Sequence, residues 1–146
     1  MRVHGLPDRA PAVVKAGLAF SPASGNRTSL ARTAKRASEF CDALLAKIGG
    51  RRGLELDGVI IYAGTEATPF FGICKPHDGN AATVGNGVMV SLAAEGPEAV
   101  QQLHSRALEL GARDEGTPGP RSRSGFDFFA GYFHDPEGNK LNFFCM

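Results

Sequence analysis

Cysteine and histidine are the residue types in this sequence that could bind a transition metal or act as nucleophiles. The chain has 146 residues, with four histidines and three cysteines. The cysteines, Cys41, Cys74 and Cys145, are too far apart in the sequence to form the C-x-x-C motif that binds zinc or carries out redox chemistry. Each lies among apolar residues, so we expect reduced, buried cysteines and a cytoplasmic location.

One histidine stands close to a second group that could transfer a proton. Tyr132 and His134 are two residues apart in an apolar run, and alternate residues of a strand lie on the same face. Because histidine titrates near neutral pH, this pair is our candidate for a catalytic acid and base. A purely structural role for His134 at the end of its strand is the alternative. The other histidines, His4, His77 and His104, are expected at the surface.

Two arginines lie close together later in the chain. Arg121 and Arg123 belong to the segment TPGPRSRSG at residues 117–125, which predicts a loop because Gly, Pro and Ser dominate it. Guanidinium groups on such a loop could bind an anionic ligand through paired hydrogen bonds. Simple exposure to solvent is the alternative for both side chains.

The composition is that of an ordinary globular domain. Hydrophobic residues make up 42% of the chain, charged residues make up 21%, and the net charge is +1, which excludes disordered and collagen-like chains. No apolar run approaches the roughly 20 residues that a transmembrane helix needs. Residues 1–36 hold seven Lys or Arg and one Asp. A nucleic-acid arm or a targeting segment would fit this charge, but no nucleic-acid motif is present, and we expect an unstructured lead-in at residues 1–12.

The same order of elements is predicted twice. Gly49-Gly50 and Gly111 each end a segment with helical spacing of apolar residues. In the first half a strand at 13–20 and a helix at 29–48 precede strands at 51–56, 59–63 and 69–74. In the second half a strand at 88–94 and a helix at 97–110 precede strands at 112–115, 126–134 and 140–145. The repeat predicts an α+β fold built from two βαβββ modules.

The end of the chain carries a specific local motif. The turn Asp135-Pro136-x-Gly138-Asn139-Lys140 enters the last strand, after a PGPR segment and a helix that ends in glycine. This order resembles the C-terminal module of the glyoxalase/bleomycin-resistance/extradiol-dioxygenase superfamily, also called the vicinal-oxygen-chelate superfamily. The resemblance covers roughly residues 28–146. It implies a single domain at 13–146, with module one at about 13–75 and module two at about 86–146. Each module would form a curved half-barrel sheet with its helix outside, and the modules would pair within one chain or between two chains.

The resemblance also implies where a metal would bind. In the superfamily's metal enzymes, four side chains from the first and last strands of each module, usually His, Gln or Glu, hold Zn, Ni, Mn or Fe. Here these positions fall on Met89 and Asn142 in module two, on about Gly72 in module one, and on a first strand without His, Gln, Asp or Glu. None of these is a good ligand for such an ion, so we expect no metal and no cofactor. A divalent metal held by other residues is the alternative.

Strand alternation, with the resemblance, predicts which residues line the cavity. The candidate ligand-binding residues are Phe71, Met89, Ser91, Arg121, Arg123, Tyr132, Asn142 and Phe144. This set is largely apolar and aromatic, which is typical of a small-molecule pocket. We therefore predict a homodimer that binds a small apolar or aromatic molecule and has no nucleic-acid or membrane partner. The alternative is a lyase or dioxygenase of the glyoxalase type, which would use a divalent metal or Tyr132 and His134.

Overall fold

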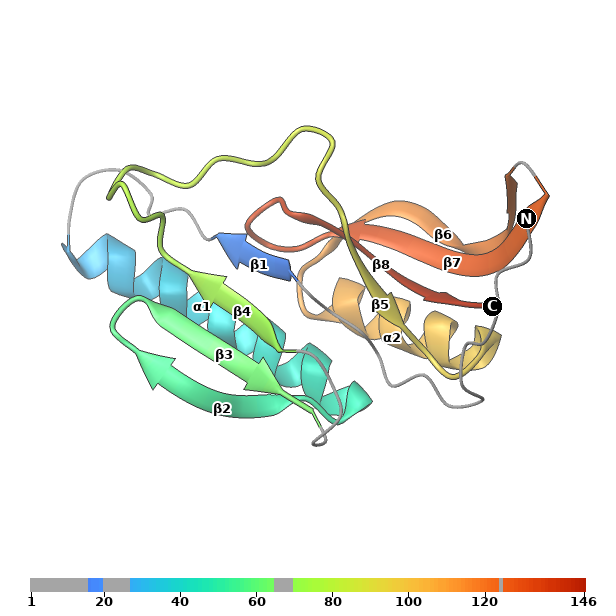
Figure 1. Cartoon of the computed structure of the whole chain (residues 1–146), viewed down its shortest axis with the longest axis horizontal. Helices are drawn as coiled ribbons and strands as arrows, with labels where there is room; N and C mark the ends of the chain where they lie inside the picture. Colours follow the sequence, from blue (N-terminus) through green and yellow to red (C-terminus); the bar gives the residue numbers. More distant parts are fainter. Residues whose placement is uncertain (1–15, 20–26, 65–69, 124) are drawn as a thin grey trace.

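The computed structural model describes residues 16–19, 27–64, 70–123 and 125–146, and these form two βαβββ modules, one after the other (Figure 1). Module one comprises β1 (Ala16–Ala19), α1 (Arg27–Leu45), a 3-10 turn (Ala46–Ile48), β2 (Arg51–Leu56), β3 (Val59–Ala63) and β4 (Phe71–Cys74). Module two comprises β5 (Val90–Ala93), α2 (Pro97–Glu109), β6 (Arg113–Arg123), β7 (Phe126–His134) and β8 (Lys140–Cys145). The predicted α+β class and the repeated order of elements are confirmed.

Each module contributes one four-stranded sheet, and the two sheets have the same topology. The strand order is β1-β4-β3-β2 in the first sheet and β5-β8-β7-β6 in the second. In both, the first strand of the module pairs in parallel with the last, and the remaining pairs are antiparallel. The sheets do not join into a closed barrel. The two modules are therefore structural repeats that lie within one chain.

The two helices place a similar apolar stripe against the sheets and belong to one shared core. The buried positions recur at the same spacing in both helices: Ala37, Phe40, Cys41 and Leu44 in α1, and Val100, Leu103, His104 and Ala107 in α2. Helix α2 packs on β6, β7 and β8, and it also contacts α1. Gly49 and Gly111 end the helical segments with φ of 78° and 95°, a conformation that glycine adopts without strain.

Strand β6 corrects one prediction from the sequence. Residues 117–125 were expected to form a loop, but β6 continues through this segment to Arg123 and pairs with β7. The strand lies at the edge of its sheet, so Pro118 and Pro120 need not donate to a second neighbour. Between Asp114 and Gly119, β6 has more residues than the part of β7 that pairs with it. Shifts in register between Asp114 and Gly116 and between Gly116 and Gly119 accommodate them.

Two further expectations concern the N-terminal part of the chain. The predicted lead-in at 1–12 lies outside the described residues, and β1 covers Ala16–Ala19 of the strand predicted at 13–20.

Within the described ranges, no helix is long and apolar enough to cross a membrane.

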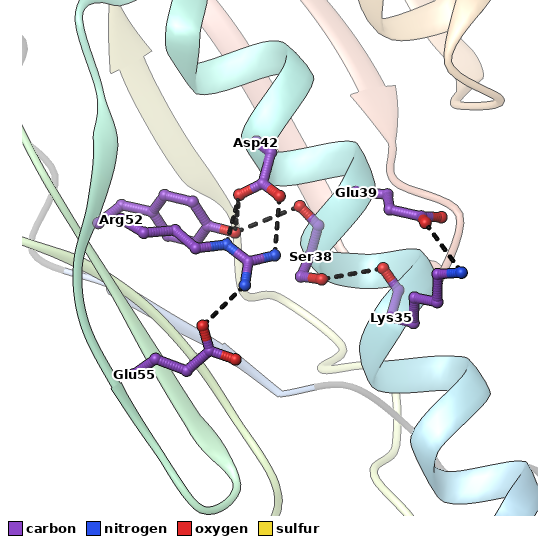
Figure 2. Close-up of polar contacts among 7 residues, drawn as sticks. Lys35, Ser38, Glu39, Asp42, Arg52 and Glu55 are labelled. Atoms are coloured by element: carbon purple, nitrogen blue, oxygen red, sulfur yellow. Dashed lines mark hydrogen bonds and ion pairs between the residues drawn. The ribbon is translucent and has the colours of Figure 1, made fainter.

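A polar cluster ties α1 to the first sheet (Figure 2). Arg52 on β2 donates from Nε and Nη2 to the two carboxylate oxygens of Asp42 on α1, at 2.8 and 2.7 Å. Its Nη1 donates to Glu55 at 2.9 Å, and the Tyr62 hydroxyl donates to Asp42 Oδ1 at 2.9 Å. Burial opposes the ionisation of Asp42, but the hydrogen bonds from Arg52 and Tyr62 outweigh it, so the pKa of this carboxyl lies below its ordinary value.

A second polar contact links the two modules. Arg36 on α1 donates to Glu137 Oε1 at 2.8 Å and to the Pro136 carbonyl at 3.0 Å, in the turn between β7 and β8. Asp135 orders that turn, because its carboxylate accepts from the backbone N–H of Glu137 and from the backbone and side chain of Asn139. The motif that carried the resemblance thus holds module one against module two.

We expect Asp42→Asn to lower the free energy of unfolding at pH 7 by about 1 kcal/mol, since solvent partly screens this half-exposed ion pair. The pKa of Asp42 is lower in the folded chain than its unfolded value near 3.8, so its contribution is present above that value and is lost as the pH falls through the folded pKa. The difference between wild type and variant, measured by urea unfolding, should therefore shrink as the pH is lowered below 3.8.

Asp57→Asn provides the matched control for this prediction. The Asp57 carboxylate is fully exposed and contacts Lys75 only at 3.4 Å, so this variant should unfold like wild type at every pH. An Asp42→Asn effect of the same size at both ends of the pH range would show that the contribution of Asp42 does not depend on its charge.

Candidate functional site

The candidate site lies on the face of the second sheet that α2 does not cover, which we call the open face. Leu141, Phe143 and Cys145 of β8 are buried in the core, so Asn142 between them points to the open face. The backbone register places Asn142 between Ser91 on β5 and Tyr132 on β7. Three of the residues predicted to bind a ligand thus form one row across three neighbouring strands.

Asn142 is the most buried polar residue of this row. Its side chain is 2% exposed, and within the described part of the chain its Oδ1 atom has no hydrogen-bond partner. An amide oxygen removed from water without a partner costs on the order of 1–3 kcal/mol. This oxygen therefore keeps an unused acceptor, and because it is also inaccessible to water, a bound molecule would reach it only by displacing the side chains that cover it.

Tyr132 has a cation on each side, from the two strands that flank β7. The Arg121 guanidinium carbon on β6 lies 5.7 Å from the ring centroid, and the Lys140 ammonium on β8 lies 5.8 Å from it. Arg121 donates to the carbonyl of Thr117 at 2.7 Å and to that of Pro120 at 3.0 Å. The site therefore presents an aromatic ring and two positive charges together.

His134 lies on the same face as Tyr132 but belongs to a charged group at the end of the row. Its Nδ1 lies 3.4 Å from Glu115 Oε2 and 3.4 Å from Arg113 Nη2. Glu115 also approaches Lys140 at 3.8 Å. These contacts are consistent with a structural role for His134. Its pairing with Tyr132 as catalytic acid and base stays a prediction.

The remaining predicted residues lie in different places. Phe144 is on the open face, between Ala93 and Ala130. Met89 precedes β5 and is 44% exposed, whereas Phe71 is buried in the core beside Tyr62. Arg123 is the last residue of β6, and its side chain lies outside the described part of the structure.

His104 corrects another expectation, since it was predicted at the surface and is only 3% exposed. Its Nε2 lies 3.1 Å from the carbonyl oxygen of Tyr132 and 3.0 Å from Asp114 Oδ1. Both partners are acceptors, so Nε2 carries the proton. A Cβ at Gly131 would lie 3.0 Å from the His104 ring, so glycine is what lets the helix approach the strand this closely. Its place in the buried stripe of α2, next to Leu103, was the signal that the sequence offered.

Solved structures share this fold over most of the chain. A glyoxalase/bleomycin resistance protein from Albidiferax ferrireducens T118 is 27% identical, with a TM-score of 0.72 over 88% of this chain and 94% of that one. This chain belongs to the glyoxalase/bleomycin-resistance/extradiol-dioxygenase superfamily. At lower identity it also resembles the fosfomycin resistance protein FosX from Mesorhizobium loti (9% identity, TM-score 0.58, 89% and 87% of the two chains) and a lactoylglutathione lyase from Agrobacterium tumefaciens (14%, 0.57, 88% and 89%). No family profile and no curated protein matches the sequence.

The superfamily's metal positions in this member do not suit a divalent ion. Gly72 offers no side chain, Met89 offers only a thioether, and Asn142 offers only a neutral amide oxygen. The described residues of β1 are Ala, Gly and Leu. Among the residues that the structure describes, no three His, Cys, Asp or Glu side chains converge.

His104→Ala should lower the free energy of unfolding by about 2–3 kcal/mol, because it leaves a cavity under β7 and removes the hydrogen bond to the Tyr132 carbonyl. Urea unfolding at pH 7 measures this loss. His77→Ala removes an exposed histidine from a turn and should leave the midpoint unchanged. Equal midpoints for the two variants would contradict the buried contacts of His104.

Proposed function

We propose that this superfamily member binds a small molecule with an aromatic or apolar body on the open face of its second sheet, without using the superfamily's metal site. The observation that supports the proposal most directly is the buried Asn142 oxygen, which has no partner among the described residues and stands in the row with Ser91 and Tyr132. A ligand with an N–H or O–H group would provide the missing donor.

The neighbours of Asn142 suit such a ligand. Tyr132 offers a ring for stacking, and Phe144 adds a second aromatic wall between the small side chains of Ala93 and Ala130. Ser91 can donate or accept a hydrogen bond beside Asn142. In small-molecule sites, a small number of polar groups on an apolar wall fix the orientation of the ligand. Two of the similar structures are named for small molecules, fosfomycin and lactoylglutathione, and a small-molecule ligand is our corresponding proposal for this chain.

A homodimer is part of the proposal. The two sheets do not close into a barrel within one chain, so a second copy would complete the enclosure of the open face, where Asn142 is already buried and Ser91 and Phe144 are half-buried. Large apolar side chains are exposed near its edges, among them Val84 and Val88 before β5 and Phe126 at the start of β7. Static light scattering of the full chain should give the mass of two copies, and the mass of one copy would contradict this part of the proposal.

The test of ligand binding compares phenol with anisole in a thermal shift experiment. The two molecules have similar apolar bodies, but only phenol donates a hydrogen bond. Phenol at millimolar concentration should raise the melting temperature of wild type, and anisole should raise it less. Asn142→Leu should abolish the difference between them. Equal shifts for phenol and anisole on wild type, or no shift for either, would overturn the proposal.

A second prediction concerns the stability of Asn142→Leu. Because Asn142→Leu removes an unpartnered buried oxygen and keeps a side chain of similar size, the ligand-free variant should unfold at a urea concentration no lower than wild type. Gln101→Leu changes an exposed amide on α2, away from the open face, and should keep the response to phenol. A marked loss of stability in Asn142→Leu would show that the amide supports the fold instead.

A further inference from the structure

We propose that the ligand carries a carboxylate, which Arg121 and Lys140 bind beside Tyr132. This inference rests on the proposed function and names the chemical class of the ligand at the same site. It follows from the charges that surround Tyr132 and from a comparison of the two repeats.

Arg121 is held in place but keeps donors available. Two of its N–H groups donate to the carbonyls of Thr117 and Pro120, which leaves three of the five guanidinium donors for another partner. No carboxylate of the described residues lies within ion-pair distance of it. A planar guanidinium that is already oriented binds a planar carboxylate through two parallel hydrogen bonds at little further entropic cost.

The charge around the site is positive. Lys140 shares Glu115 with His134, and its contact with this carboxylate is long, at 3.8 Å. Arg113 adds a further guanidinium at the same end of the row. Among the described residues, the carboxylate of Glu115 is the one that lies within 4 Å of any of the cations Arg113, Arg121 and Lys140. A bound carboxylate would offset the repulsion between the two cations that flank Tyr132.

The first sheet has the same strand pairing without such a row of polar groups. By register, Gly72 lies between Gly17 and Ile61, as Asn142 lies between Ser91 and Tyr132. The row in module one therefore carries no polar side chain, and it forms the same sheet. Strand pairing in this topology therefore does not need a polar row, and the row in module two is available for binding.

The experiment measures binding of 4-hydroxybenzoate and of 4-hydroxybenzamide to the full chain by isothermal titration calorimetry at pH 7. Both probes carry an aromatic ring and a hydroxyl donor, and only the first carries a negative charge. The acid should bind at least about tenfold more tightly than the amide, which corresponds to about 1.4 kcal/mol. Arg121→Gln and Lys140→Gln should each weaken the acid several-fold and leave the affinity for the amide unchanged. Arg121→Lys, which keeps the charge, should retain part of the preference.

Arg51→Gln is the matched control, because it removes one exposed positive charge from β2 in the other sheet. It should change neither affinity, and the ligand-free melting temperature of each variant reports whether it is folded. If wild type binds both probes equally, or if Arg51→Gln weakens the acid as much as Arg121→Gln does, the carboxylate inference is overturned while the proposed binding function stands. If wild type binds neither probe, the inference and the proposed function fail together.

Discussion

The stacking of Phe133 on Phe143 beneath α2 is the contact on which the candidate site depends. The ring centroids lie 5.5 Å apart, and both side chains are fully buried. With these residues committed to the core, alternation leaves Tyr132 and Asn142 only the open face. Burying each large apolar side chain contributes about 1.5–3 kcal/mol, so the core behind the sheet can offset one unpartnered amide oxygen in front of it. The polar row is thus held in position by the apolar residues between its members.

The two repeats place different polar groups on the same framework. In module one the polar cluster lies between helix and sheet, where Tyr62 and Arg52 hold Asp42, and the row at Gly72 is featureless. In module two Phe133 stands at the position of Tyr62, His104 and Asp114 meet between helix and sheet, and the amide of Asn142 lies on the open face. Duplication allows this division, because the pairing of strands needs only backbone hydrogen bonds and one apolar face. Both modules contribute buried apolar residues to the shared core, and the polar row belongs to module two.

Local patterns in the sequence were sufficient to predict the repeat, the ends of the helices and which residues of β8 face the core. Glycine in the left-handed conformation ends both helical segments, and the alternation of Leu141, Phe143 and Cys145 fixes where Asn142 points. The contacts of Arg121, Glu115 and His104 could not be read in the same way, because they depend on how strands and helix meet in space. The place of His104 in the apolar stripe beside Leu103 indicates burial, but nothing in the sequence indicates which acceptors its ring would contact. The lack of a partner for the Asn142 oxygen is also a property of the folded environment, and no sequence pattern reports it.

The features that made β6 resemble a loop are those that position Arg121. The irregular register between Gly116 and Gly119 leaves Thr117 out of the regular ladder, so its carbonyl can accept from Arg121. A Cβ at Gly119 would lie 3.0 Å from Arg121 Nη1, so a larger residue here would displace the guanidinium slightly. An edge strand of regular sequence would pair more evenly with β7, but it would offer no free carbonyl and no room for the guanidinium. Prolines, glycines and bulges at this edge therefore place a preoriented cation beside Tyr132, while the buried strands behind it retain regular pairing.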